Sequence, residues 1–212
     1  MEKIVRYSEI FESFQGEAQP LGERVLFIRL SGCNLNCSFC DTKEKINIIN
    51  EIDIDQLCDQ ISFYSTVVIT GGEPLLQVDT ITYLAILRPN ITFYIETNGV
   101  LNPRGLIQLK NVNFNISPKP DAKYHIHPKF KNVEAKRKIY KFVIDPDEKV
   151  FLVNTELQDV IQQLPKRSIY FMPLTTSLDK QMLLEEHASV AKIARKYKVN
   201  FSPRLHILFD FQ

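Results

Sequence analysis

Short apolar, β-branched runs alternate with amphipathic stretches along most of this chain. The apolar runs predict strands at 25–30, 66–70, 92–96, 114–117, 139–144 and 169–172, and a last short strand by Phe201. The amphipathic stretches predict helices at 53–64, 79–88, 104–109, 155–163 and 179–197. This alternation is typical of βα units around a parallel sheet. About six strands are fewer than the eight of a closed barrel, so we expect an α/β fold, a partial (β/α) barrel of about six parallel strands.

The stretch 119–138 breaks this pattern, because it is rich in lysine and is interrupted by Pro120 and Pro128. We interpret it as a loop or lid. Its His125 and His127 lack a third ligand beside them, so we do not expect a metal site there. The chain has no internal repeat, and we expect a single domain over 1–212.

Composition narrows the classes of function. The 212 residues are 44% hydrophobic and include 14 Phe and 8 Tyr, which is enough for a substantial core. Lys and Arg number 26 and Asp and Glu 25, a balance that argues against binding of nucleic acid and favours a small-molecule partner. No apolar run is long enough to cross a bilayer, and no signal-peptide core follows Met1. We therefore expect a cytoplasmic protein without a membrane contact.

Three of the four cysteines lie together in CNLNCSFCDT at 33–42, directly after a predicted strand. Cys33, Cys37 and Cys40 have the spacing CxxxCxxC, too tight for an ordinary disulfide framework. Three thiolates on one short loop can bind three irons of a 4Fe-4S cluster and leave the fourth iron open. A zinc site completed by a distant residue, or cysteines that only pack, are the alternatives. Cys58 lies on the apolar face of a predicted helix and is expected to pack.

A second motif, TGGEP at 70–74, follows the next predicted strand. Gly71 and Gly72 would let the backbone come close to a ligand, and Glu73 offers an acceptor to an ammonium group. Most Gly-Gly pairs only turn the chain. Together with the cysteine spacing and Phe39, however, the motif resembles the radical S-adenosylmethionine superfamily. The resemblance implies that the open iron binds S-adenosyl-L-methionine, which is cleaved to a 5′-deoxyadenosyl radical.

Further segments make the resemblance more specific. YSEIFESFQGE at 7–17, Arg29, CDT at 40–42, ETNG at 96–99 and SPK at 117–119 resemble the 7-carboxy-7-deazaguanine synthase family. The resemblance covers essentially the whole chain. It implies conversion of 6-carboxy-5,6,7,8-tetrahydropterin, a small-molecule pterin substrate, to 7-carboxy-7-deazaguanine with loss of ammonia, in queuosine and 7-deazapurine biosynthesis. It also implies Mg²⁺, an electron donor such as flavodoxin, and a homodimer.

The resemblance assigns roles residue by residue. Arg29 near a strand end has a planar fork suited to a carboxylate, although a surface salt bridge would also explain it. Substrate contacts are expected from Phe14, Gln15, Gly16, Glu17, Arg29, Thr97 and Gln212. S-adenosylmethionine contacts are expected from Phe39, Cys40, Asp41, Gly71, Gly72, Glu73, Gly99, Ser117, Pro118, Lys119, Met172 and Pro173. Thr42 is expected to bind Mg²⁺; without the family it would be an ordinary helix N-cap.

Two positions depart from the family's pattern. Ala18 stands where a second glycine usually follows QGE, and Met172 replaces the usual glutamine before Pro173. Arg204 and His206, near the end of the chain, could line the same cleft. A glycyl-radical activating enzyme shares the cysteine spacing and GGEP but acts on a partner protein, and a non-enzymatic iron-sulfur or zinc module is the alternative outside enzymes.

Overall fold

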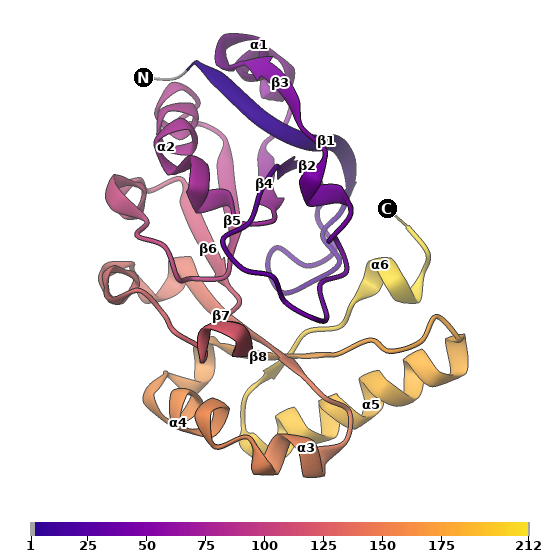
Figure 1. The fold of residues 1–212 in the computed structure, drawn as a ribbon. Helices are drawn as coiled ribbons and strands as arrows, with labels where there is room; N and C mark the ends of the chain where they lie inside the picture. Colours follow the sequence, from indigo (N-terminus) through magenta and orange to yellow (C-terminus); the bar gives the residue numbers. More distant parts are fainter. Residues whose placement is uncertain (1–2, 212) are drawn as a thin grey trace.

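One sheet of nine strands organises the protein, whose computed structural model describes residues 3–211. The strand order is β3-β1-β2-β4-β5-β6-β7-β8-β9, and every neighbouring pair from β2 to β9 is parallel. The sheet curls without closing, and its main helices lie outside the curl (Figure 1). The expected partial barrel is therefore confirmed. Its parallel strands are β2 (Arg24–Leu30), β4 (Thr66–Gly71), β5 (Thr92–Thr97), β6 (Val112–Ile116), β7 (Lys138–Ile144), β8 (Ile169–Pro173) and β9 (Asn200–Phe201).

Two antiparallel strands at one edge were not among the predicted elements. β1 (Ile4–Phe14) pairs with β2, and β3 (Asn50–Asp53) pairs with β1. The alternation along β1 is weak, because most of its residues are half-buried or exposed, and a register shift lies between Tyr7 and Glu9. Edge strands of this kind are hard to recognise from apolar runs, since their pattern depends on which neighbour covers them.

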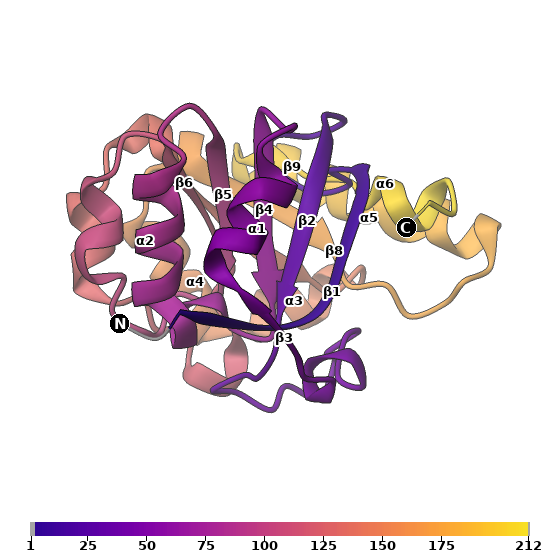
Figure 2. The same cartoon turned by 90° about the horizontal axis from the view of Figure 1, so that it is seen from above.

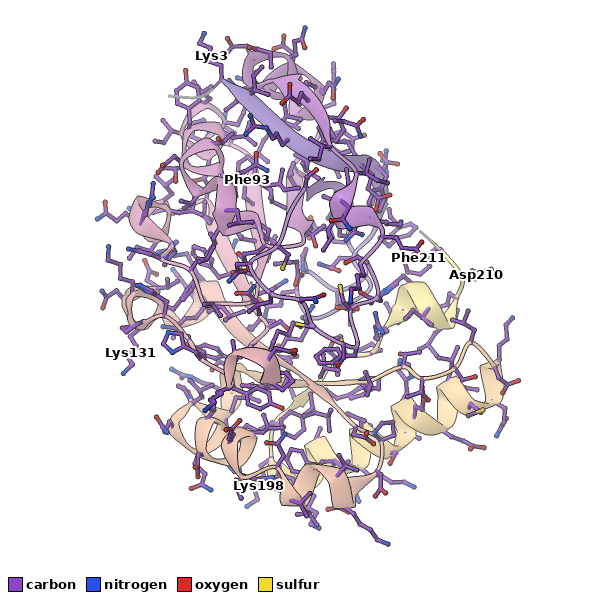
Figure 3. All side chains as sticks on the ribbon, in the orientation of Figure 1. Lys3, Phe93, Lys131, Lys198, Asp210 and Phe211 are labelled. Atoms are coloured by element: carbon purple, nitrogen blue, oxygen red, sulfur yellow. The ribbon has the colours of Figure 1, made fainter. Side chains whose placement is uncertain are left out.

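The parallel strands have one apolar and one polar face, as the two-residue period of a strand requires. Residues that point outward toward the helices are fully buried, among them Ile28, Ile69, Ile95 and Phe142. Residues at alternate positions point inward and include the charged groups of Arg29, Glu96 and Lys141. Figure 3 shows Phe93 inside the molecule and lysines such as Lys131 and Lys198 at its surface. The apolar core thus lies between the sheet and the helices, and the inner face is free for chemistry.

The predicted helices are present with small shifts of their ends. They are α1 (Ile54–Ile61), α2 (Val78–Leu87), α4 (Thr155–Gln163) and α5 (Lys180–Tyr197), while 104–109 forms a 3-10 helix at Arg104–Gln108. Side chains cap the N-termini of α4 and α5: Asn154 Oδ1 accepts from Leu157 N at 3.0 Å, and Asp179 Oδ1 accepts from Met182 N at 3.0 Å. Two short helices, α3 (Glu148–Val153) and α6 (Leu205–Leu208), were not predicted. Figure 2 shows α1 and α2 in front of the strands of the sheet.

The Lys-rich stretch 119–138 is a packed part of the fold. It forms three short 3-10 helices, and Tyr124, Phe130 and Val133 are buried in the main core. The ring of Phe130 packs edge-on against Phe114, with centroids 5.4 Å apart. The stretch has neither an α-helix nor a strand before Lys138, which agrees with a loop, but single apolar residues between the lysines anchor it in the core, which does not fit a lid. Cys58 is buried in α1, as predicted.

No helix in the described part of the chain is both long and apolar enough to cross a membrane.

Candidate active site

A cavity of about 500 Å³ opens on the inner face of the sheet. Several wall residues follow the carboxyl ends of parallel strands, which is where loops gather in partial and closed (β/α) barrels. Many of the residues singled out from the sequence line this cavity. They are Phe14, Gln15, Gly16, Glu17, Arg29, Cys33, Cys37, Phe39, Cys40, Asp41, Thr42, Gly71, Gly72, Thr97, Ser117, Lys119 and Met172.

Four of the expected site residues do not belong to this wall, and a fifth cannot be placed. Glu73, Gly99, Pro118 and Pro173 are absent from the residues that line the cavity within 3–211, and Gln212 lies outside the described residues. Gly99 has a φ of 80°, and a Cβ there would come within 2.7 Å of Ile116 Cγ2. A local backbone reason thus accounts for this glycine, and its contact with a cofactor stays a prediction.

The residues 33–42, here called the cysteine loop, place all three thiols at the cavity. The loop leaves β2 and returns to its base, where Gly32 N donates to Ile46 O at 2.8 Å. Cys33, Cys37 and Cys40 are free thiols. Burial raises the pKa of Cys33 and raises that of Cys37 to about 11. Because thiolates are the metal-binding form, loading of this site must release protons.

This donor set fits an iron-sulfur cluster better than a closed zinc site. Among the described residues, no three Cys, His, Asp or Glu side chains are already gathered around one point as a single metal ion would require. A cluster larger than one ion is compatible with three thiols spread over one loop. Thr42 Oγ1 lies 3.7 Å from Cys40 Sγ, so its hydroxyl is also at the cavity. Thr42 does not cap the following short helix, whose N-cap is Glu44.

The two glycines of TGGEP are required by the end of β2 and the start of the cysteine loop. Gly71 has a φ of 145°, and a Cβ on it would collide with the carbonyl oxygen of Leu30. A Cβ on Gly72 would collide with the Gly32 carbonyl oxygen and lie 2.7 Å from Cys33 Cβ. The backbone that these glycines approach is therefore the end of β2 and the start of the cysteine loop. This contact binds the two motifs together.

Glu73 is completely buried, and its carboxylate binds groups of its own protein. Its carboxylate accepts hydrogen bonds from Leu75 N at 2.9 Å, Thr97 Oγ1 at 2.8 Å and Asn98 N at 2.7 Å. Burial raises the pKa of Glu73, although the three hydrogen bonds act in the opposite direction. Glu73 therefore joins the turn after β4 to the end of β5 and orients Thr97 at the cavity wall. Its contact with an ammonium group stays a prediction.

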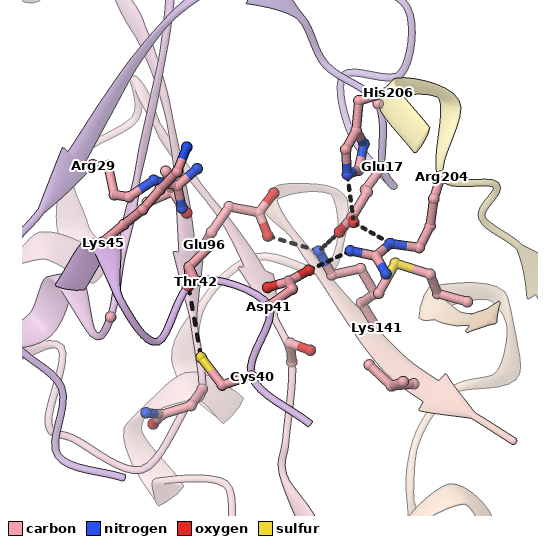
Figure 4. A pocket seen from close by; sticks show the side chains of 18 of the residues that line it. Glu17, Arg29, Cys40, Asp41, Thr42, Lys45, Glu96, Lys141, Arg204 and His206 are labelled. Carbon is pink, nitrogen blue, oxygen red and sulfur yellow. Dashed lines mark hydrogen bonds and ion pairs between the residues drawn. The ribbon is translucent and has the colours of Figure 1, made fainter. Parts of the chain in front are cut away.

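A group of charged and titratable side chains, here called the ion cluster, joins widely separated parts of the chain at the cavity (Figure 4). Its members are Glu17, Asp41, Glu96, Lys141, Arg204 and His206. Lys141 Nζ donates to Glu17 Oε2 at 2.7 Å and to Glu96 Oε2 at 3.0 Å. Arg204 Nε donates to Glu17 Oε1 at 3.0 Å, and its Nη2 donates to Asp41.

Opposite charges in the ion cluster keep Glu17 and Lys141 charged at neutral pH, whereas one member of the cluster is an exception. Burial alone would raise the pKa of Glu17, but Lys141, Arg204 and His206 lower it well below its usual range. Burial would lower the pKa of Lys141, but Glu17 and Glu96 raise it. The exception is His206, whose pKa is lowered by burial despite the nearby Glu17 carboxylate, so this imidazole is neutral at pH 7.

Gln15 has most of its hydrogen-bonding capacity satisfied by the protein. Its Nε2 donates to Glu96 Oε1 at 3.1 Å and to Gln19 O at 3.4 Å, and its Oε1 accepts from Glu17 N at 3.1 Å. An amide oxygen has two acceptor positions, so one remains for a substrate donor. The turn thus fixes which end of the amide faces the cavity.

Arg29 is paired with Glu9 beneath the cavity wall. Arg29 Nε donates to Glu9 Oε1 at 2.6 Å, and Lys45 Nζ donates to both oxygens of Glu9 at 3.1 and 3.2 Å. Arg29 and Lys45 both line the cavity. Arg29 can therefore form a salt bridge and still contact a substrate carboxylate. Its Nε binds Glu9, and the other donors of the guanidinium stay available to an anion.

The segment that follows β9 completes the wall. Leu205 N donates to Gly16 O at 2.9 Å, and Ala18 N donates to Ser202 Oγ at 2.7 Å. A Cβ on Gly16 would lie 2.9 Å from His206 N, so glycine is required for this contact. Arg204 and His206 line the cavity, as the sequence suggested. Ala18 has a φ of 50°, a conformation that the family's usual glycine adopts without strain.

Several lining residues were not predicted. Lys141 and Glu96 lie within the predicted strands 139–144 and 92–96, at positions that alternate with buried apolar residues. A charge inside an otherwise apolar strand is the signal that could have identified both. Lys45 and Phe211 offered no such signal, because nothing in their local sequence shows which way they point.

An apolar part of the wall is formed by Met172, Val143 and Leu174. Met172 occupies the position of the family's usual glutamine, so a thioether stands there in place of an amide. The thioether cannot donate a hydrogen bond to a cofactor and is only a weak acceptor.

Comparison with known proteins agrees with this geometry. The family model described as radical SAM superfamily matches residues 27–131. A 7-carboxy-7-deazaguanine synthase of Hyperthermus butylicus is 37% identical over 97% of this chain and 92% of its own length. The enzyme of the same name from Aquifex aeolicus is 28% identical over 99% of this chain and 95% of its own length.

Solved structures show the same fold. The crystal structure of QueE from Escherichia coli superposes with a TM-score of 0.71 at 20% identity and covers 96% of this chain and 95% of that one. The structure of anSMEcpe with bound AdoMet and a peptide covers 81% of this chain and 60% of that one, with a TM-score of 0.50 and 13% identity. Taken with the cysteine loop and the full-length sequence match, these findings show that the chain belongs to the 7-carboxy-7-deazaguanine synthase family of radical SAM proteins.

Proposed function

We propose that this protein is a 7-carboxy-7-deazaguanine synthase, a carbon-nitrogen lyase that converts 6-carboxy-5,6,7,8-tetrahydropterin to 7-carboxy-7-deazaguanine with loss of ammonia, in queuosine and 7-deazapurine biosynthesis. One observation supports this most strongly: a single cavity brings the three thiols of the cysteine loop together with Gln15, Glu17, Arg29 and Thr97. Gln15 and Glu17 come from the motif at 7–17, Thr97 comes from ETNG, and Arg29 comes from the strand that precedes the cysteine loop.

The cavity offers separate places for cofactors and substrate. Cys33, Cys37 and Cys40 would hold a 4Fe-4S cluster, and Thr42 would contribute its hydroxyl to Mg²⁺. S-adenosyl-L-methionine would lie along lining residues Phe39, Asp41, Gly71, Gly72, Ser117 and Lys119. When bound, the cluster and S-adenosylmethionine supply the electron and the carbon radical with which the reaction begins.

The protein's own residues bind and orient the substrate. Arg29 and Lys45 present two cations to the pterin's carboxylate, and a guanidinium can grip it with two parallel bonds. Glu17 is ionised and accepts from the N–H groups of the heterocycle, while the free position on Gln15 Oε1 accepts one more. Phe11, Phe14 and Phe27 give the cavity an apolar side that excludes water.

Anaerobic reconstitution with iron and sulfide, followed by product analysis with the tetrahydropterin, tests this function. We expect 7-carboxy-7-deazaguanine to form, with a higher rate when Mg²⁺ is present. Cleavage of S-adenosylmethionine without this product would favour a glycyl-radical activating enzyme. Bound metal without any cleavage would favour a non-enzymatic iron-sulfur or zinc module.

Four further features belong to this proposal. A flavodoxin-like protein would supply the electron, two copies of the chain would form a homodimer, the enzyme would work in the cytoplasm, and 1–212 would act as one domain. The 37% identity with the Hyperthermus butylicus enzyme supports the activity to which these features belong. Reduction assays with a purified flavodoxin and size measurement in solution test the first two.

A further inference from the structure

Lys141 places a charged ammonium group in the middle of the sheet. It lies in β7 between buried Tyr140 and Phe142, and its side chain is only 6% exposed. An ammonium in such a position is strongly destabilising unless charges and hydrogen bonds compensate it. No motif of the family includes this lysine, so we infer its role from its hydrogen-bond partners.

The partners of Lys141 are two carboxylates that lead to the expected substrate contacts. Glu17 receives one hydrogen bond directly, at 2.7 Å. Glu96 receives the other at 3.0 Å, and its second oxygen accepts from Gln15 Nε2 at 3.1 Å. Gln15 Oε1 in turn accepts from Glu17 N. One ammonium therefore closes a ring that contains both Gln15 and Glu17.

We propose that Lys141 is a positioning residue for the substrate, acting through Glu96 on Gln15 and directly on Glu17. This inference rests on the proposed function. Glu17 has a second cationic partner in Arg204, whose guanidinium also pairs with Asp41, and the neutral imidazole of His206 lies 3.7 Å from Glu17 Oε1. Glu96 has instead the amides of Gln15 and Asn115 as its other hydrogen-bond partners in the described part of the chain.

Loss of the ammonium would therefore affect Glu96 first. A buried carboxylate without a cation takes up a proton or turns toward water. A protonated Glu96 is a weaker hydrogen-bond acceptor than the carboxylate, and a Glu96 that turns toward water withdraws its oxygen from Gln15 Nε2. The amide would lose its fixed orientation, and Glu17 would lose the bond that holds its Oε2. Substrate binding should weaken, while the cysteine loop, which Lys141 does not contact, should keep its function.

The variant Lys141→Met, assayed as reconstituted holoenzyme, tests this. We expect the KM for the tetrahydropterin to rise roughly 10- to 100-fold, the range for losing a charged hydrogen bond, with kcat changed by no more than about threefold. Iron content and cleavage of S-adenosylmethionine without pterin should equal those of the wild type. Lys138→Met is the matched control on the same strand, because its ammonium binds the carbonyl oxygens of Phe130 and Lys131, away from the cavity. It should leave the KM unchanged.

A double variant separates positioning from direct contact with the substrate. When Lys141→Met is combined with Glu96→Gln, the uncompensated carboxylate is gone, and the amide oxygen of the substituted side chain can again accept from Gln15. We expect the KM to recover about tenfold relative to Lys141→Met alone. No recovery would mean that Lys141 binds the substrate itself or serves stability alone, and would overturn the proposal, as would an unchanged KM in Lys141→Met.

Two further measurements keep the test decisive. If Lys141→Met does not fold, Lys141→Arg is tested in its place, because it retains a cation for both carboxylates. A moderate rise in KM alone in this variant would support the proposal. A change confined to kcat would overturn it. Wild-type turnover of the tetrahydropterin is measured in the same assay. Its absence refutes the proposed function, while wild-type turnover with an unaltered KM in Lys141→Met refutes only the role of Lys141.

Discussion

Gly72 shows how a single missing side chain can hold two motifs together. Its Cα faces the carbonyl oxygen of Gly32 and the Cβ of Cys33, so there is no space for a methyl group. Glu73 N also donates to Gly32 O at 2.9 Å, which binds the turn after β4 to the base of the cysteine loop. A side chain at this position would have to push that loop away from the sheet.

Gly72→Ala should therefore reduce cluster loading. We expect a loss of about 1–3 kcal/mol in stability, typical of overpacking, and an iron content after anaerobic reconstitution well below that of the wild type. Thermal melting and iron analysis measure the two effects. Gly105→Ala is the matched control, because nothing lies within 4 Å of the added Cβ. Equal iron content in Gly72→Ala and the control would refute this account of the glycine.

For single residues, the sequence predicted which side chains carry the chemistry of the site, but it did not predict their hydrogen-bond partners. Spacing and resemblance singled out Cys33, Cys37, Cys40 and Arg29, because their residue types carry the chemistry whatever surrounds them. They did not show that Glu73 binds backbone groups of its own protein, or that Gln15 is largely satisfied by Glu96 and Glu17. Such partners come from distant strands, and a one-dimensional pattern contains no information on which distant residue faces which.

At the scale of elements, the stretch 119–138 is held in place by a few apolar anchors. Phe130 is fully buried against Phe114, and the Tyr124 hydroxyl accepts a hydrogen bond from Asn154 Nδ2 at 2.9 Å. Lys119 begins the stretch at the cavity, where its Nζ donates to Ser117 Oγ at 2.8 Å. The stretch thus supports the cavity wall from behind.

Phe130→Ala should destabilise the whole protein. Removing a fully buried phenylalanine costs about 3–5 kcal/mol, which urea unfolding of the purified protein can measure. Lys129→Ala, at an exposed neighbouring position, should change the free energy of unfolding by less than about 0.5 kcal/mol. A similarly small effect of Phe130→Ala would show that the stretch is only loosely attached and would favour the lid after all.

The parallel strands and long helices were predictable because their residues are buried on one or both faces and repeat with a clear period. β1 and β3 were missed because an edge pair lies partly in solvent and alternates weakly. α3 and α6 are too short, at 6 and 4 residues, for a helical period to show. The missed elements matter for function, since β1 leads into the turn with Gln15 and Glu17, and α6 begins at the residue that binds this turn, Leu205.

For the whole molecule, the ion cluster makes the free energy of unfolding depend on pH. Because the pKa of Glu17 is lowered in the folded protein, Glu17 stabilises the fold at pH values above its pKa in the unfolded chain, about 4.3. This stabilisation is lost as the pH falls further. The raised pKa of Lys141 means that its contribution is present below about pH 10 and is lost as the pH rises through the folded value. His206 has a lowered pKa, so its neutral form favours the fold above about pH 6.5.

We therefore expect the stability to be greatest between about pH 7 and 10 and to fall on the acid side. Urea unfolding at about pH 7 and about pH 3 should show a larger loss of stability in the wild type than in Glu17→Gln, whose amide does not titrate. The variant will be less stable at neutral pH, because Lys141 and Arg204 lose a charge partner. An equal loss between the two pH values in both proteins would show that Glu17 does not govern the acid limb.

The wall of the cavity is assembled from residues at widely separated positions in the sequence, with Gly16 and Glu17 near its beginning and Arg204 and His206 after the last strand, β9. During synthesis on a ribosome, the earlier strands can pair while this final stretch is still hidden in the exit tunnel. At that stage Glu17 and Asp41 lack the guanidinium that pairs with both of them in the complete protein. The ion pairs of Arg204 can therefore form only after the end of the chain has emerged.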